Sequence, residues 1–106
     1  MSKFNIKQDD TSPAIQGQLK DSDGNNIDIS GASVDFHMVD GNSTIVDDSA
    51  TITDASAGKV KYEWSASDTT DAGIYKGEFE VTYADGSIET FPNTGFITIE
   101  IHIEGA

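Results

Sequence analysis

The chain has 106 residues, no cysteine, and six lysines with no arginine against nineteen acidic side chains, which gives a formal net charge of −13. A chain of this length predicts one domain over residues 1–106, burying roughly 65% of its unfolded surface. The negative charge argues against nucleic acid and anionic membranes as partners, because both are bound chiefly through lysine and arginine. The lack of cysteine argues against disulfides, thiolate catalysis and the common zinc sites.

The first residues do not look like a secretion signal, because Met1 to Phe4 do not continue into an apolar run. No stretch approaches the ~20 apolar residues of a membrane-spanning helix. We therefore expect synthesis in the cytoplasm. Hydrophobic residues make up only 36% of the chain, but five phenylalanines, three tyrosines and one tryptophan indicate a folded protein.

Apolar and polar side chains alternate with a period of two between clusters of Asp, Asn and Gly, which indicates short strands joined by turns. In chain order, the alternating sets are Phe4 and Ile6; Ile15, Gly17 and Leu19; Val34, Phe36 and Met38; Ala50 and Ile52; Val60, Tyr62 and Trp64; the odd positions of 75–83; and Ile97, Ile99, Ile101 and Ile103. One helical turn is expected at residues 65–70, where Ser65, Ser67 and Asp68 are suitable caps.

The pair Asp85-Gly86 predicts a two-residue type I′ hairpin, with Tyr83 opposite Ile88 and Val81 opposite Thr90. Seven or eight short strands, with turns every 8–12 residues, favour an all-β fold. The predicted architecture is an antiparallel β-sandwich.

The segment Asp71-Ala72-Gly73-Ile74-Tyr75 resembles the Asp-x-Gly-x-Tyr run that enters strand F of immunoglobulin-like domains. In that family the tyrosine hydroxyl bonds backward to the backbone, so the resemblance implies a structural corner at Asp71, Gly73 and Tyr75. A cysteine follows two residues later in those domains, but Gly77 stands here, so the inter-sheet disulfide is absent. The expected core aromatics are Trp64, Phe36, Phe79 and Tyr62.

The loop at residues 21–28 carries oxygen ligands of the kind that calcium prefers, at Asp21, Asp23, Asn25 and Asp28. The EF-hand register fails, because placing Gly24 at the glycine position would make Leu19 the first ligand. Asx turns explain the same residues without a metal, and we expect no metal site.

Two pairs of adjacent carboxylates, Asp9-Asp10 and Asp47-Asp48, have the composition of an acid–base pair. Neighbours on a strand point to opposite faces, so one member of each pair is expected to be solvated.

The two histidines, His37 and His102, fall on the polar sides of their strands and are expected at the surface. Neither a phosphate-binding loop nor a nucleophile elbow is present. We therefore predict no catalytic residue, no cofactor and no enzymatic activity. The remaining enzyme hypothesis would need a carboxylate pair such as Asp35 with Asp47.

A series of short segments in a particular order covers almost the whole of residues 3–103. They are residues 4–8, 10–13, 19–25, 29–34, 36–38, 57–64, 68–75, 78–82, 85–86 and 90–93. Together they resemble the immunoglobulin-like N-terminal domain of phage baseplate upper proteins (BppU-like), which recurs as a stand-alone phage or prophage protein.

This resemblance implies a non-enzymatic structural component of a tailed-phage virion, made in the host cytoplasm. It is expected to assemble with other virion proteins in many copies, or as a homo-oligomer in the particle. Capsid decoration, a head-fibre protein and a neck protein are the alternatives within the virion. The alternative from another class is a module that binds carbohydrate or the host surface. That module would need exposed aromatic residues, for which Phe91 and Phe96 are the candidates.

Strand edges are the expected docking sites, because their unpaired backbone groups can pair with a neighbouring chain. The segment Lys3 to Lys7 and the last strand, from Phe96 to Ile103, are the candidates. The expected interface residues are Phe4, Ile6, Thr98 and Glu100.

Overall fold

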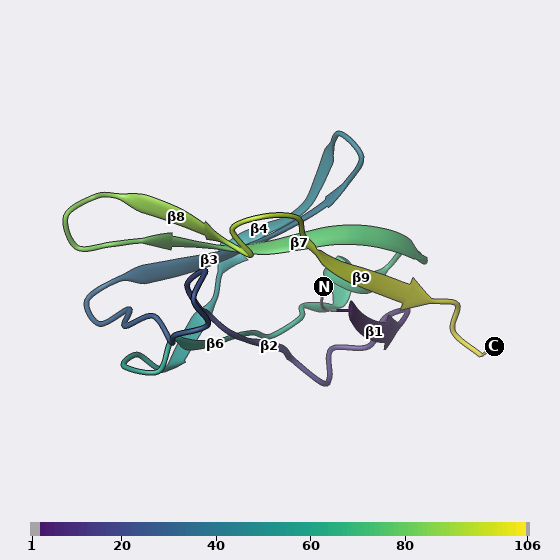
Figure 1. Cartoon of the computed structure of the whole chain (residues 1–106). Helices are drawn as coiled ribbons and strands as arrows, with labels where there is room; N and C mark the ends of the chain where they lie inside the picture. Colours follow the sequence, from purple (N-terminus) through teal and green to yellow (C-terminus); the bar gives the residue numbers. More distant parts are fainter. Residues whose placement is uncertain (1–2, 106) are drawn as a thin grey trace.

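The computed structural model describes residues 3–105 and forms two facing layers of β-sheet (Figure 1). Met1, Ser2 and Ala106 lie outside the described residues. The elements are β1 (Lys3–Lys7), β2 (Ile15–Gln18), β3 (Ser33–Asp40), β4 (Ser43–Ser49), β5 (Thr51–Asp54), β6 (Lys59–Tyr62), the 3-10 helix η1 (Ala66–Thr69), β7 (Gly73–Thr82), β8 (Ile88–Phe91) and β9 (Ile97–His102). Among these residues, no helix is long and apolar enough to cross a bilayer.

The larger sheet has the strand order β1-β9-β7-β3-β4, and β8 also pairs with β7. Strand β7 has ten residues, so one of its edges holds two partners in succession. Gly73 to Gly77 pair with β9, and Phe79 to Thr82 pair with β8. The other edge of β7 pairs with β3. Strands β8 and β9 therefore follow one another along the same edge of β7.

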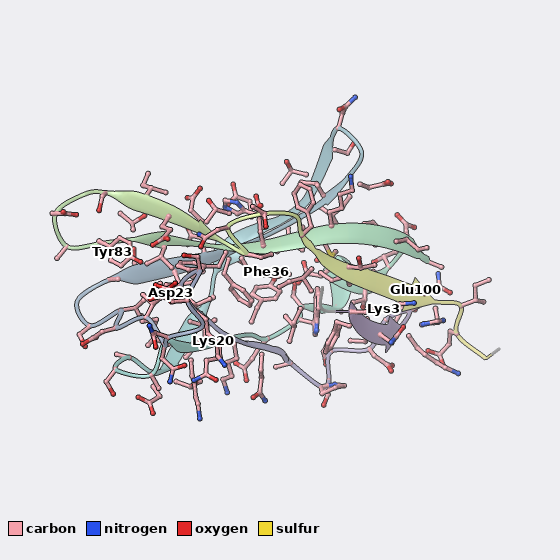
Figure 2. The ribbon with its side chains drawn as sticks, viewed as in Figure 1. Lys3, Lys20, Asp23, Phe36, Tyr83 and Glu100 are labelled. Atoms are coloured by element: carbon pink, nitrogen blue, oxygen red, sulfur yellow. The ribbon has the colours of Figure 1, made fainter. Side chains whose placement is uncertain are left out.

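The smaller sheet has the order β2-β6-β5, and its inner face closes the core. Phe36, in β3, is 0% exposed and lies between the two layers (Figure 2). Every second residue of β7 from Tyr75 to Val81 is buried, as the period of two predicts. Each large apolar side chain removed from water contributes roughly 1.5–3 kcal/mol.

The structure confirms the predicted all-β, immunoglobulin-like sandwich, with two differences in detail. The described residues form nine strands, because β4 is a strand that the sequence pattern does not reveal. Only Val46 is buried in β4, so its apolar residues do not alternate over a core. The sandwich also contains one parallel pair, because β1 runs beside β9 in the same direction.

The β7–β8 hairpin differs from the predicted two-residue turn. Thr82 pairs with Ile88 and Val81 pairs with Glu89, so the register is shifted by one residue. Gly86 donates to the carbonyl of Tyr83 at 2.9 Å and has a φ of +89°. The Tyr83 nitrogen donates to the carbonyl of Ser87 at 2.8 Å, so residues 84–86 form a three-residue loop, which is a common alternative to type I′.

The predicted core face of the last strand is also wrong at its end. Strand β9 ends at His102, and the side chain of Ile103 is 63% exposed, whereas Ile101 is 2% exposed. No strand of either sheet pairs with the chain beyond His102 among the described residues. The alternation of apolar and polar residues in the sequence therefore continues to Ile103, one apolar position beyond the last buried residue.

Candidate functional site

The corner before β7 is built on a backward hydrogen bond. The Tyr75 hydroxyl donates to the carbonyl oxygen of Asp71 at 2.7 Å. Gly73, between them, has a φ of +157°, which an L side chain rarely adopts. Burial, and then the Asp71 carboxylate, raise the pKa of the Tyr75 hydroxyl above its ordinary value. Asp71, Gly73 and Tyr75 therefore hold the start of β7 in place.

Four aromatic residues meet at the centre of the sandwich. The Phe36 ring lies 4.8 Å from Tyr62, 5.7 Å from Trp64 and 5.1 Å from Phe79, measured between centroids. All four are buried. The Trp64 indole nitrogen has no hydrogen-bond partner among residues 3–105. These residues form the core.

Strand β1 is an edge of the larger sheet, but β9 is not. Both edges of β9 are paired, one with β1 and the other with β7. The hypothesis that the last strand offers free backbone groups is therefore wrong. β9 lies inside the sheet because β1 returns to cover it.

The four expected interface residues lie in different surroundings. Ile6 is only 5% exposed and belongs to the core, so it is not available to a partner. Phe4 and Thr98 are half-buried. Glu100 pairs with Lys3 at 2.8 Å. Figure 2 labels both residues. That ammonium group, as a hydrogen-bond donor, lowers the pKa of the Glu100 carboxyl.

The acidic loop after β2 uses its carboxylates to hold its own backbone. Asp21 Oδ1 accepts hydrogen bonds from the backbone nitrogens of Asp23 and Asn25, each at 2.9 Å. Asp28 Oδ1 accepts from the Ser30 hydroxyl at 2.6 Å and from the Ser30 backbone nitrogen at 2.9 Å. The Ser30 hydroxyl and then its backbone nitrogen lower the Asp28 pKa. These are Asx turns.

A cluster of ionisable residues lies on the outer face of the larger sheet. Asp35, His37 and Glu80 place their ligand-type atoms within 4.8 Å of one another. Asp47 Oδ1 lies 3.0 Å from His37 Nε2. Asp35 and His37 are neighbours on one face of β3, and the pairing of β3 with β4 and β7 brings Asp47 and Glu80 to them.

The other ionisable candidates make local contacts. His102 is half-buried on the outer face, with Nε2 2.9 Å from Asn5 Oδ1. Asp48 Oδ1 accepts from the backbone nitrogen of Ser49 at 2.8 Å. Asp9 and Asp10 are exposed in the turn after β1.

The two phenylalanines beside Pro92 do not form a shared aromatic surface. Phe91 is 4% exposed and packs in the core. Phe96 is 37% exposed, and the Lys76 ammonium lies 5.1 Å from its ring centroid. The expectation that both rings are exposed is wrong for Phe91, because its pairing with Phe79 turns it inward.

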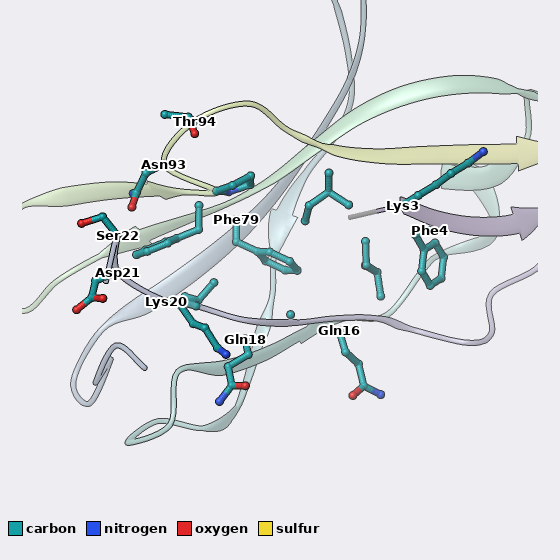
Figure 3. A pocket seen from close by; sticks show the side chains of 16 residues that line it. Lys3, Phe4, Gln16, Gln18, Lys20, Asp21, Ser22, Phe79, Asn93 and Thr94 are labelled. Carbon is teal, nitrogen blue, oxygen red and sulfur yellow. The ribbon is translucent and has the colours of Figure 1, made fainter. Parts of the chain in front are cut away.

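One surface feature was not anticipated from the sequence. A groove of about 680 Å³ lies between β2 and the turn that joins β8 to β9 (Figure 3). We call it the β2 groove, and its apolar lining includes Ile15, Phe79, Phe91 and Ile97. It forms where the smaller sheet ends at β2 while the larger sheet continues.

The fold places this chain in the class of immunoglobulin-like β-sandwiches. Its candidate functional sites are strand edges and the β2 groove. A family model for the BppU N-terminal domain matches residues 3–99. The chain belongs to this family of phage baseplate structural domains, as its sequence resemblance implied.

Comparisons with individual proteins add information about the fold. A search of curated proteins found no match. A solved structure described as CopC from Methylosinus trichosporium OB3b is similar, with a TM-score of 0.57 and 12% sequence identity. The similarity covers 100% of this chain and 89% of that one. At this identity the likeness concerns the fold alone.

Proposed function

We propose that this chain is a non-enzymatic structural component of a tailed-phage virion that docks to other baseplate proteins in multiple copies. The observation that carries the proposal is the match of the BppU N-terminal domain model to residues 3–99. Such a protein acts by presenting surfaces, and this sandwich offers strand edges at β1, β2, β4, β5 and β8.

The distribution of charge supports an assembly role. Acidic side chains lie mainly in turns and on outward strand positions, where they keep unrelated strand edges from pairing. A partner that meets this acidic coat needs a neutral or basic surface.

The proposal is tested by locating the protein in particles made from the phage genome that encodes it. We expect mass spectrometry to find it in purified virions and cryo-electron microscopy to place its sandwich in the baseplate. Density on the capsid or at the neck would contradict the baseplate assignment. Its absence from purified particles would contradict the structural role altogether.

The non-enzymatic part of the proposal has its own test. We expect the purified chain to show no turnover on a broad panel of hydrolase substrates. Activity that is lost in an Asp35→Asn variant would contradict this expectation, because Asp35 lies in the ionisable cluster on the outer face.

A further inference from the structure

We propose that the β2 groove binds an extended segment of a partner virion protein, which adds a fourth strand to the smaller sheet beside β2. The inference rests on the proposed structural function and identifies the surface that performs the docking. The segment is neutral or acidic and carries apolar side chains at alternate positions. Three observations on the described residues support it.

The first observation is the free backbone edge of β2, which ends the order β2-β6-β5. The Leu19 nitrogen donates to the carbonyl of Gly58 at 2.8 Å, so Leu19 faces the β6 side. Backbone hydrogen bonds in an antiparallel strand point to opposite sides at successive residues. Gln16 and Gln18 therefore direct their N–H and C=O groups away from β6, toward the position of an added strand.

The second observation is the apolar floor. Phe79 and Phe91, which are 1% and 4% exposed, form the base of the groove beside this edge, and the half-buried side chains of Phe4 and Ile97 add accessible apolar surface. Gly17 has no side chain to fill the space, and a Cβ there would lie 3.1 Å from the Phe79 ring. An added strand would therefore place every second side chain on this floor.

The third observation is the charge around the groove. Its lining contains two of the six lysines, Lys20 and Lys3, the second of which is paired with Glu100 at 2.8 Å, but only Asp21 of the nineteen acidic residues. Figure 3 shows Lys20 beside β2 and Lys3 on the other side of the groove. This local charge fits a neutral or acidic segment and disfavours a basic one.

The edge strands differ in how well they are protected against pairing. The edge strand β4 carries the acidic residues Asp47 and Asp48, a usual device against unwanted pairing. The outward residues of β2, Gln16 and Gln18, are uncharged. A second copy of this chain is a poor occupant, because two chains with a charge of −13 repel each other. These features favour a different protein as the occupant of the groove.

The contact is tested by photo-crosslinking in assembled particles. We would place benzoylphenylalanine at Gln16 of the full chain, and at Thr44 on β4, an edge strand of the larger sheet, as a control. We expect the probe at Gln16 to crosslink to one continuous segment of another virion protein, and the probe at Thr44 not to reach that segment. A crosslink from Gln16 to a second copy, or to the chain itself, would overturn the proposal.

The backbone contact is tested by comparing Gln16→Pro with Gln16→Ala. Proline removes the outward N–H without removing a ladder bond, and alanine removes only the side chain. We expect Gln16→Pro to lower incorporation into particles at least tenfold and Gln16→Ala to change it less than twofold. Equal incorporation of both variants, with melting temperatures close to that of the wild type, would overturn the proposal.

A second pair of variants covers the case in which Gln16→Pro does not fold. Lys20→Glu reverses a charge at the groove, and Lys59→Glu makes the same change outside its lining. We expect only Lys20→Glu to lower incorporation, by at least fivefold, and equal effects would overturn the proposal.

The result for the wild-type chain separates failure of the groove from failure of the proposed function. If the wild-type chain enters particles but the probe at Gln16 finds no partner segment, the groove proposal fails and the structural function stands. If the wild-type chain is absent from particles, both fail.

Discussion

Tyrosine hydroxyls in this sandwich are held in their protonated form by burial and by neighbouring carboxylates. The Tyr62 hydroxyl donates to Asp68 Oδ2 at 2.5 Å, and the Tyr83 hydroxyl donates to Glu89 Oε1 at 2.7 Å. Burial, followed by these hydrogen bonds, raises the pKa of Tyr62 and raises the pKa of Tyr83 to about 12. An ionised phenolate would have to face a carboxylate at both positions.

These shifts predict a loss of stability in alkaline solution. In the unfolded chain tyrosine has a pKa of about 10, so the unfolded state releases its protons first as the pH rises. The free energy of unfolding should therefore fall from about pH 10 through the folded-state pKa of Tyr83, near 12. Urea denaturation at several pH values would measure this slope. Tyr83→Phe should make it shallower, and an identical slope in that variant would contradict the prediction.

Gly77 is required by close packing rather than by its backbone angles. A Cβ at this position would lie 2.5 Å from Ile99 Cδ1 and 3.2 Å from the Phe36 ring. We expect Gly77→Ala to destabilise the fold by about 1–3 kcal/mol, because overpacking forces its neighbours to move.

A double-mutant cycle separates this overcrowding from other effects of Gly77→Ala. Ile99→Val removes the methyl group that the new Cβ would meet, so the double variant should be more stable than the sum of the two single effects predicts. Chemical denaturation of the four proteins would measure the coupling. Strict additivity would show that Ile99 is not the obstacle.

At the scale of the strand, the end of β9 offers a matched pair of isoleucines, one inside the strand and one just beyond it. Ile101 is 2% exposed and Ile103 is 63% exposed, although the sequence places both on one alternating face. We expect Ile101→Ala to lower the free energy of unfolding by about 2–5 kcal/mol. Ile103→Ala should change it by less than about 0.5 kcal/mol. Equal losses in urea denaturation would show that the core extends beyond His102.

Most strands could be predicted from the sequence, because a strand between a core and solvent must alternate. Strand β4 could not, since it is an edge strand with Val46 as its one buried residue. The β7–β8 hairpin was predicted in the right place but one residue out of register. An Asp-Gly pair suits several turn lengths, and the choice depends on which residues the strands bury.

The candidate sites were less predictable than the strands. The Asp-x-Gly-x-Tyr motif located the corner at Tyr75, because that contact is local in sequence. The β2 groove is lined by residues from both ends of the chain, from Lys3 to Ile97, so no local sequence pattern predicts it. The ionisable cluster around His37 likewise depends on strand pairing.

For the molecule as a whole, the charge of −13 predicts a dependence of stability on salt. Like charges spread over a small surface repel one another, and the repulsion is relieved when salt screens them. We expect the melting temperature of the isolated chain to rise from about 10 mM to about 150 mM sodium chloride.

A charge-reduced variant provides the control for this salt effect. Asp23→Asn with Glu104→Gln removes two exposed negative charges and should show a smaller rise. Differential scanning calorimetry would measure both proteins. A flat or falling melting temperature in the wild-type chain would contradict the prediction.

By itself, the sequence determined the class of fold, the burial of every second residue in most strands, and the acidic coat. These properties follow from local alternation and composition, which physical chemistry relates directly to burial and solvation. Only the tertiary structure decided which strands became edges. Strand β9 is covered because β1 pairs with it, whereas β2 is left open beside an apolar floor. Pairing between distant strands depends on the whole chain, so the surface available to a partner appears only in three dimensions.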